Sequence, residues 1–576
     1  MTSPLAALAP LVSSAIERAL GPEFAGADPV LRPSQFADVQ CNAPLALAKK
    51  VGAPPRDVAA RIVEALDLAE QCSGIEISGP GFINLTFADG WLEGLVAAVA
   101  ADDRLGVPTE QRQVIPIDYS APNVAKEMHV GHLRTTVVGD ALARTLEHLG
   151  HEVVRQNHIG DWGTPFGMLL EHLTDVGPDS AEAGLLETDP NAFYQAARER
   201  FDGDEEFATR SRARVVQLQA GEPETLRLWE SLVELSRHYF NRIYALLDVT
   251  LADEHLAGES TYNDQLEGIC AELEEKGLAT VDNGALCVFL DGYTGREGKP
   301  VPLIIRKSDG GYGYATTDLA TVKHRVQTLG ADRILYVIGA PQSLHLQMCW
   351  QTARLAGWLP EDVEVVHVQI GNVLGPDRKI LRTRSGTPLR LMALLEEAVA
   401  TARRVIDASR PDLDEDVRAT IAPQVGIGAV KYADLSVAHD SEYVFDLDRM
   451  TALTGNTGPY LQYAAARIRS ILRRGAVDGA SGAAIRLAEP AERALGLRLL
   501  EFGEVVESVG RELEPHRLCG FLFEVAQDFS GFYEQCPVLQ APDAATRASR
   551  LALAGLTLDV LVQGLDLLGI EAPERM

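Results

Sequence analysis

Hydrophobic and polar positions change their spacing twice along this chain. Residues 1–110 mix helical spacing, as in 55–70, with a short strand-like stretch at 75–87, which predicts a small α+β module. From residue 114 short apolar runs alternate with amphipathic ones. Strand signals then fade, and helical spacing alone predicts an all-α bundle at 451–576.

A strand, a helix and a second strand are expected between residues 114 and 160. The run 114–120 is largely apolar, 131–150 has one apolar helical face and ends at Gly150, and 151–160 is extended again. A βαβ unit of this length implies parallel strands. With further strand candidates at 333–340 and 363–374, the pattern predicts an α/β domain.

This α/β domain is predicted to span residues 111–450. The polar, proline-containing stretch 101–113 separates it from the N-terminal module. The acidic, helix-prone stretch near 175–260 reads as a helical insertion within it.

Composition narrows the classes of function. Fifty-two basic residues against 82 acidic ones give a net charge of −30, which on average repels nucleic acid, although a local basic face is still possible. Acids or glycines interrupt every apolar stretch before the roughly 20 residues of a membrane span. No basic residue precedes Arg18, unlike in a signal peptide. We therefore expect a soluble cytoplasmic protein without a membrane partner.

Cysteine spacing bears on metals and disulfides. The seven cysteines are dispersed, with no close pair at the spacing of a zinc site or a redox motif. We expect reduced thiols, no disulfide, no structural metal and no zinc.

The stretch SAPNVAKEMHVGH, residues 120–132, is the strongest candidate for chemistry. His129 and His132 flank Gly131 where the predicted strand becomes a helix. The pair could be accidental, could ligate a metal with two visible ligands, or could donate to phosphate oxygens at a helix N-terminus. In the third case Gly131 leaves room for a nucleotide, and Lys126 adds a positive charge.

The sequence around these histidines resembles a known family. The first signature consists of Pro122, Asn123, Val124, Ala125, Lys126, Glu127, Met128, His129, Val130, Gly131 and His132. Together with 133–170, it closely resembles the class I aminoacyl-tRNA synthetases, in the form of the arginyl-tRNA synthetase family. The resemblance extends to 41–50, 77–87, 455–468, 532–539 and 567–576, so it spans the chain.

A second signature is expected after the last strand of the α/β domain. The stretch GPDRKILRTRSG, residues 375–386, resembles a degenerate form of the family's KMSKS motif that lacks the usual second lysine. Lys379, Arg382 and Arg384 still provide three cations near the pyrophosphate, although a solvated basic loop is the alternative. In family members of this form, Lys126 is implied to compensate.

A pocket for arginine needs acceptors at fixed angles around a planar guanidinium. Tyr314 and Asp318 are four residues apart on a predicted helix, although Tyr314 could be core and Asp318 a helix N-terminal charge. The resemblance implies that Asn123 holds the ligand's backbone end. It implies an arginine-binding set of Asp118, Ser120, Asn123, Tyr314, Asp318 and Gln342.

The resemblance also implies the reaction and its nucleotide contacts. Arginine and ATP, the latter with Mg²⁺, would form arginyl-adenylate and pyrophosphate, and arginine would then pass to the terminal ribose of tRNA(Arg). Catalysis would rest on positioning and on electrostatic stabilisation by His129, His132, Lys126, Lys379, Arg382 and Arg384. ATP would contact His129, Gly131, His132, His345 and Lys379, although His345 could instead cap a helix.

The helical tail combines arginines with aromatic residues. Such clusters are usually solvated faces, but they also suit a single-stranded RNA loop. By resemblance, residues 451–576 form an anticodon-binding domain, residues 1–110 touch tRNA, 111–450 is a Rossmann-type catalytic domain, and the enzyme is a monomer. The implied tRNA contacts are Tyr460, Tyr463, Arg467 and Met576.

Two other functions are compatible with parts of this pattern. A small-molecule nucleotidyltransferase shares the HxGH site and the sheet, but it has no use for a basic, aromatic tail. A non-catalytic paralogue that only binds tRNA should have lost Asp318 or the histidines, and this chain retains them.

Overall fold

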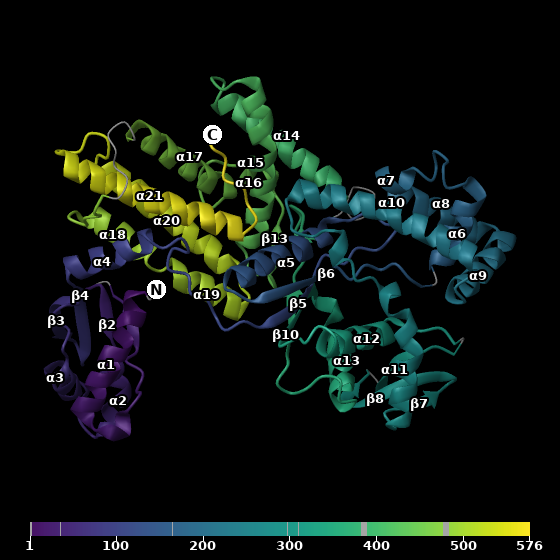
Figure 1. Ribbon diagram of the computed structural model, residues 1–576, viewed down its shortest axis with the longest axis horizontal. Coiled ribbons are helices and arrows are strands. Elements are labelled where there is room, and N and C mark those ends of the chain that lie inside the picture. The colour runs from purple at the N-terminus through teal and green to yellow at the C-terminus, as the bar shows by residue number, and fades with distance from the viewer. Residues whose placement is uncertain are drawn as a thin grey trace.

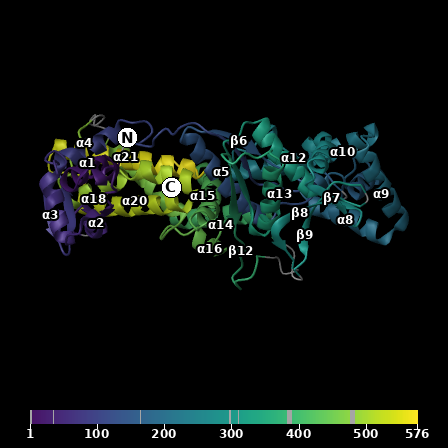
Figure 2. The same cartoon turned by 90° about the horizontal axis from the view of Figure 1, so that it is seen from below.

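The computed structural model describes residues 3–34, 36–163, 165–295, 298–308, 310–381, 389–475 and 483–576. The molecule is elongated, with the N-terminal module at one end and the helical insertion at the other (Figure 1). The view from below shows the same order of parts (Figure 2). The C-terminal helices lie between the central sheet and the N-terminal module, and they contact both.

A parallel four-stranded sheet forms the centre. Its strands are β5 (Val114–Asp118), β6 (Glu152–Gln156), β10 (Arg333–Gly339) and β11 (Glu364–Ile370). Their order is β11-β10-β5-β6 with every pairing parallel, which confirms the predicted α/β class. The direction of winding reverses between β5 and β10. Ligands bind at such a reversal in doubly wound sheets, outside the carboxyl ends of the strands.

Helix α5 (Val130–His148) connects β5 to β6, and most of its residues are buried. Leu133, Val137 and Leu142 are fully buried on the face that their spacing predicted. Gly150 follows the helix with φ +99°, in the region that favours glycine. Because the C-terminal helices pack on its other side, α5 is a rigid support for whatever stands at its N-terminus.

Five helices occupy the stretch expected to be helical and extend away from the sheet in Figure 1. They are α6 (Pro165–Val176), α7 (Leu185–Thr188), α8 (Pro190–Gly203), α9 (Glu205–Gln219) and α10 (Pro223–Leu247). Short 3-10 turns η2 (Asp253–His255) and η3 (Glu259–Tyr262) bring the chain back toward the sheet.

A small antiparallel sheet follows, which the sequence analysis did not predict. Its strands are β7 (Ala279–Asp282), β8 (Ala285–Thr294) and β9 (Pro300–Arg306), in the order β7-β8-β9. Leu286, Val288, Leu303 and Ile305 point into a separate core shared with α11 (Asn263–Glu275), α12 (Tyr314–Gln327) and α13 (Ser343–Leu355). The 3-10 turn η4 (Ala340–Gln342) precedes α13.

The N-terminal module is a four-stranded antiparallel sheet covered by helices. Its elements are α1 (Pro4–Leu20), η1 (Pro22–Phe24), β1 (Leu31–Pro33), β2 (Val39–Cys41), α2 (Ala43–Val51), α3 (Pro55–Ala65), β3 (Cys72–Ser78), β4 (Phe82–Phe87) and α4 (Asp89–Ala100). The stretch 75–87 is most of a hairpin, β3 and β4, rather than one strand. Its turn contains Gly79 and Gly81, both with positive φ.

Described residues after 450 are helical, as predicted, and further helices precede them from residue 391 onward. Together these helices are α14 (Leu391–Ser409), α15 (Glu415–Leu435), α16 (Leu447–Met450), α17 (Gly458–Gly475), α18 (Pro490–Leu499), α19 (Phe502–Glu512), α20 (His516–Gln535) and α21 (Ala544–Leu567). Two short strands, β12 (Val373–Leu374) and β13 (Tyr443–Val444), pair in parallel.

The sequence analysis expected no segment apolar enough to span a membrane, and helix α21 is an exception by length and composition. By length and composition alone it is apolar enough to cross one. In the described structure 61% of its most apolar window is buried, with Leu553, Val560 and Leu561 inside the bundle. Burial among other helices explains its composition as that of a core helix.

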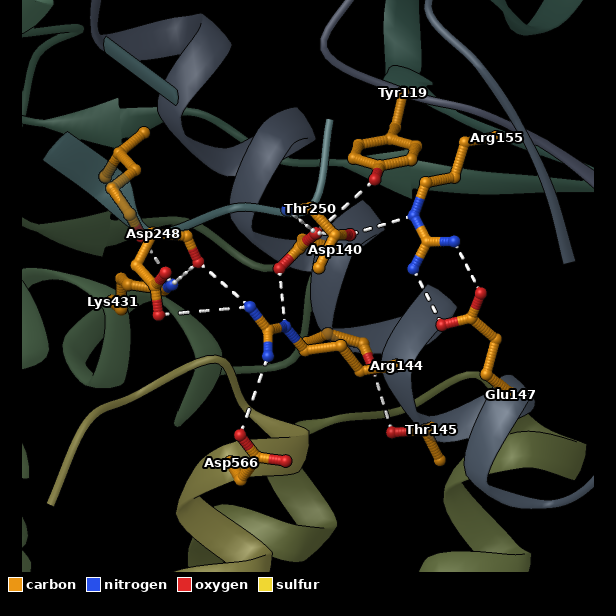
Figure 3. A network of polar contacts seen from close by, with 12 residues as sticks. Tyr119, Asp140, Arg144, Thr145, Glu147, Arg155, Asp248, Thr250, Lys431 and Asp566 are labelled. Atoms are coloured by element: carbon orange, nitrogen blue, oxygen red, sulfur yellow. Dashed lines mark hydrogen bonds and ion pairs between the residues drawn. The ribbon is translucent and has the colours of Figure 1, made fainter. Parts of the chain in front are cut away.

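A polar network around the C-terminal half of α5 joins it to the C-terminal helices (Figure 3). We call it the α5 network, and its members include Tyr119, Asp140, Arg144, Glu147, Arg155, Asp248, Thr250, Lys431 and Asp566. Asp140 accepts from Arg144 Nε at 2.8 Å and from the backbone N–H of Thr250 at 2.7 Å. Lys431 of α15 donates to the carbonyl of Leu247 at 2.6 Å. The network therefore connects α5, α15 and the segment after α10.

Candidate active site

The N-terminus of α5 holds two histidines in one defined arrangement. His129 Nδ1 accepts from the N–H of Gly131 at 3.1 Å, and His132 Nδ1 accepts from the N–H of His129 at 3.0 Å. The ring centroids are 4.0 Å apart. Since each Nδ1 is an acceptor, a neutral ring carries its proton on Nε2. The pair thus presents two Nε2–H donors at a helix N-terminus, where the first backbone N–H groups already donate within the protein.

Both imidazoles are neutral near pH 7. Burial lowers the pKa of His129, and burial with the neighbouring His129 lowers the pKa of His132 to about 3. Gly131 is exposed, and a Cβ there would lie 2.8 Å from His129 Cε1. The glycine therefore makes room first for the His129 ring, which refines the sequence expectation that it makes room for a nucleotide.

The loop between β5 and α5 has an unusual backbone. Ser120, Ala121 and Ala125 have φ of 71°, 46° and 58°, in the region that non-glycine residues rarely adopt. Such backbone strain clusters at ligand sites, where the surrounding structure maintains it.

Within this loop Asn123 is exposed and Ser120 is not. A Cβ on Gly160 would lie 2.4 Å from Asn123 Oδ1, so only glycine allows this side chain its place. The Ser120 hydroxyl is buried, 2.8 Å from Tyr244 Oη and 2.9 Å from Thr136 Oγ1. The structure thus leaves Ser120 beneath the loop and does not bring its side chain to an open pocket.

The first signature lies against the segment that follows the second. The N–H of Val130 donates to Leu389 O at 3.1 Å, and that of Leu391 donates to Met128 O at 2.9 Å. Buried Glu127 accepts from Arg390 Nε at 2.8 Å. These contacts hold the stretch after residue 388 against the start of α5.

Lys126 points toward the helical insertion. Its Nζ lies 4.9 Å from the ring centroid of Tyr194 on α8. The charge of Tyr194 also contributes to the raised pKa of Tyr314, after burial and the charge of Glu259. Through Tyr194, helix α8 thus contacts the first signature.

Lys379 is exposed on a tight turn. The N–H of Gly375 donates to Lys379 O at 2.8 Å, and Arg378 has φ +57°. The turn borders an open cavity of about 870 Å³ that Asn372 and Glu442 also line. Arg382 and Arg384 lie outside the described residues.

Helices α12 and α13 bring a second group of polar residues to the end of β10. His345 Nε2 and Asp318 Oδ2 are 2.5 Å apart, and the hydrogen bond to Asp318 raises the pKa of His345. Tyr314 is 70% exposed one turn before Asp318, so it is not a core residue. Gln342 is exposed in η4. His345, expected near the adenosine, thus has Asp318 as its first partner.

Asp118 does not face an open pocket in this structure. Its Oδ2 accepts from Arg325 Nη2 at 2.8 Å, and both side chains are almost fully buried. The Arg325 guanidinium also lies 4.8 Å from the ring centroid of Tyr336. The sequence analysis assigned Asp118 to a substrate guanidinium, whereas the structure pairs it with one from the protein itself.

The sequence analysis missed several residues that surround Asp318. His158 Nε2 lies 4.0 Å from Asp318 Oδ1. Burial and the charges of Asp161 and Asp318 raise the pKa of Glu259 to about 8. Neighbouring acids that raise one another's pKa favour a bound cation. His158 and Asp161 fall within the family-like stretch 133–170, but nothing in the spacing around Glu259 indicated a site.

Family models match successive parts of the chain. Residues 6–87 match the arginyl tRNA synthetase N terminal domain, and residues 95–447 match the catalytic domain of tRNA synthetases class I (R). Residues 461–576 match the DALR anticodon binding domain. The catalytic match alone covers more than half of the chain. The chain belongs to the arginyl-tRNA synthetase family.

Individual relatives agree with this assignment over the full length. The arginine–tRNA ligase of Thermobifida fusca is 68% identical over 577 residues, covering 100% of both chains. The crystal structure of arginyl-tRNA synthetase from Plasmodium falciparum matches with a TM-score of 0.83 at 26% identity, covering 100% of each chain. That of Thermus thermophilus matches with a TM-score of 0.79 at 26% identity, covering 99% of this chain and 100% of its own.

The residues that the family resemblance assigned to tRNA differ in exposure. Tyr463 is 40% exposed, and the guanidinium of Arg467 lies 4.6 Å from the Tyr533 ring centroid. Tyr460 is half-buried against Phe523. The side chain of Met576 is buried, with only 8% exposed, so in this arginyl-tRNA synthetase family member it packs into the bundle rather than facing RNA.

Proposed function

We propose that the site at the junction of β5 and β10 carries out the family reaction with the residues described above. The activity is that of an arginine–tRNA ligase: arginine is activated with ATP, and tRNA is charged with it. The arginine carboxylate attacks the α-phosphorus of ATP and pyrophosphate leaves. A ribose hydroxyl of tRNA then attacks the arginyl carbonyl and AMP leaves.

His129 and His132 act on the phosphates as neutral donors. Their Nε2–H groups stand at the N-terminus of α5, where the positive end of the helix dipole also favours an anion. Lys126 and the exposed Lys379, with Arg382 and Arg384, supply positive charge for the leaving pyrophosphate. The expanded phosphate of the transition state is stabilised electrostatically, without a protein nucleophile.

Mg²⁺ accompanies ATP as part of the substrate. Around the first signature Asn123 is the exposed oxygen donor, while Glu127 is engaged with Arg390. This donor set fits an ion held mainly by phosphates and water.

Arginine binds with its guanidinium among the acids at the start of α12. Asp318 supplies negative charge, and Glu259 supplies a carboxyl whose ionisation a bound guanidinium would favour. Tyr314 and Gln342 supply polar contacts, and Asn123 holds the backbone end. The observation that carries this proposal is the partly exposed Asp318 carboxylate one turn after the exposed Tyr314 at the start of α12. The raised pKa of Glu259 agrees with it, since a guanidinium near these acids would relieve their repulsion. Asp118 and Ser120 support the pocket from beneath.

Transfer RNA contacts both ends of the chain in this proposal. Residues 451–576, with exposed Tyr463 and the stacked pair Arg467 and Tyr533, bind the anticodon loop. Residues 1–110 touch the tRNA outside the anticodon. The enzyme acts as a soluble cytoplasmic monomer, and the burial of α21 inside the bundle supports the first of these three properties.

The test is ATP/pyrophosphate exchange with each amino acid, with and without tRNA. We expect exchange that depends on arginine. Asp318→Ala should weaken arginine recognition by about 2 to 5 kcal/mol because a buried guanidinium loses its charged partner. The matched control is Asp291→Ala, on the exposed part of β8. Exchange that prefers another amino acid, or a normal KM for arginine in Asp318→Ala, would refute the proposal.

A further inference from the structure

Three potential metal ligands meet between α12 and α13. His345 and Cys349 are one turn apart on α13, so both project from the same face of the helix toward Asp318 of α12. Cys349 Sγ lies 3.6 Å from His345 Nε2, and His345 Nε2 lies 2.5 Å from Asp318 Oδ2. The three donor atoms all lie within 4.8 Å of one another. We call these residues the Asp318 cluster.

The separations can be compared with those of a tetrahedral zinc site. Zn–S and Zn–N bonds of about 2.3 and 2.05 Å place sulfur and nitrogen about 3.6 Å apart. The observed Sγ to Nε2 distance is 3.6 Å. A carboxylate oxygen should stand about 3.4 Å from the nitrogen, so Asp318 must withdraw by about 0.9 Å. Its side chain is 23% exposed, so it has room to turn.

The chemistry of the donors selects the kind of cation. One thiolate, one imidazole and one carboxylate suit Zn²⁺ and similar borderline ions, while Mg²⁺ and Ca²⁺ prefer oxygen alone. Cys349 is fully buried, and burial with the charge of Asp318 raises its pKa well above the ordinary value. Without a cation it is a neutral thiol, and binding a cation displaces the thiol proton to solvent.

We propose that Asp318, His345 and Cys349 form a Zn²⁺ site. The site is available in the substrate-free enzyme and is blocked when arginine binds. Three protein ligands leave the fourth position to water. The cation and the substrate guanidinium both require the Asp318 carboxylate, so they exclude each other. The binding of the cation stands independently, whereas its competition with arginine rests on the proposed function of Asp318.

The first experiment measures binding with Co²⁺, which reports its ligands by absorption. Metal-free protein titrated with Co²⁺ should develop a thiolate-to-cobalt band in the near ultraviolet at one equivalent. Cys349→Ser should lose that band. The matched control is Cys270→Ser, a buried thiol on α11 in the same core, which should keep it. No band in the wild type, or a band that survives in Cys349→Ser but not in Cys270→Ser, would overturn the site.

The second experiment tests the competition. Arginine should raise the apparent dissociation constant of Co²⁺, and Zn²⁺ should inhibit arginine-dependent exchange. Each variant is compared with its own metal-free rate. Cys349→Ser should need at least about 10-fold more Zn²⁺ for half inhibition, since a ligand is lost, while Cys270→Ser should not.

The outcomes separate this inference from the proposed function. Co²⁺ binding that ignores arginine, in an enzyme that still activates arginine, overturns the competition alone. Co²⁺ binding in a protein that fails to activate arginine overturns the proposed function and leaves the metal site standing. A thiol that binds no Co²⁺ would be a small apolar core residue, and the inference would fail.

Discussion

The two ends of α5 use polar residues in opposite ways. At the C-terminal half Asp140 is buried, but Arg144 and Thr250 saturate it with hydrogen bonds. Burial opposes its ionisation, yet the charges of Arg144 and Lys431 keep its pKa below the ordinary value. At the N-terminal end His129 and His132 are neutral, and among the described residues their Nε2 atoms have no hydrogen-bond partner.

This difference separates structural from functional polarity within one helix. The α5 network has its charges compensated inside the protein, so its role is to hold α15 and the segment after α10 against α5 (Figure 3). The histidines leave two donors open beside a helix N-terminus, so their partner must come from outside. Residues whose burial and bonding are already complete are poor candidates for ligand contacts, as Ser120 illustrates.

The largest effect should follow from removing the centre of the α5 network. Asp140→Ala leaves the buried Lys431 without this carboxylate and the partly buried Arg144 without its shortest ion pair, which should lower the free energy of unfolding by about 3 to 5 kcal/mol. Urea unfolding measures this change. The matched control is Asp566→Ala, whose side chain is 75% exposed and lies 3.7 Å from Arg144, with an expected loss below about 1 kcal/mol. Equal losses would mean that burial does not decide the contribution.

Lys431 provides a pH-dependent test of the same network. Burial lowers its pKa to about 8 from an ordinary value of 10.5. The folded protein therefore releases this proton first, and the unfolded chain binds more protons between those two values. Stability relative to Lys431→Met should rise from pH 8 to 10.5 by up to about 3 kcal/mol. Urea midpoints of both proteins across this range measure the difference, and a flat or falling difference contradicts the assignment.

Sequence patterns predicted the parts of the fold that depend on local spacing. The spacing of hydrophobic positions changes near residue 114, and this change predicted the β5–α5–β6 unit. A second change in that spacing, toward the C-terminal region, predicted the C-terminal helices. The antiparallel sheet was missed because β8 combines a short alternation with three consecutive buried residues, Leu286 to Val288. Such a run has no distinctive period.

The candidate site was predictable only in part, for a related reason. The histidines of the first signature and Asp318 are recognisable from their immediate neighbours. The partner of Asp118 is Arg325, 207 positions away, and no local pattern reports such a pair. The Asp318 cluster escaped because cysteine spacing was examined for pairs of cysteines, whereas here one histidine and one cysteine share a helix turn. Long-range contacts decide which acids are free and which are already paired.

The smallest effect on the fold, and a selective one on activity, should follow from His129→Ala. The variant loses one of two donors to the phosphates, so arginine-dependent exchange should slow about 10²-fold, equivalent to about 2.7 kcal/mol. The free energy of unfolding should fall by only about 1 kcal/mol, because the variant loses one helix cap and leaves no buried charge without its partner.

The matched control is His148→Ala at the far end of α5, where the ring contacts Gln563, and its exchange rate should stay near normal. Binding of tRNA, measured on filters, should be the same in both variants. If His129→Ala instead lost tRNA binding or several kcal/mol of stability, that end of the helix would be structural, and the contrast between the two ends of α5 would not hold.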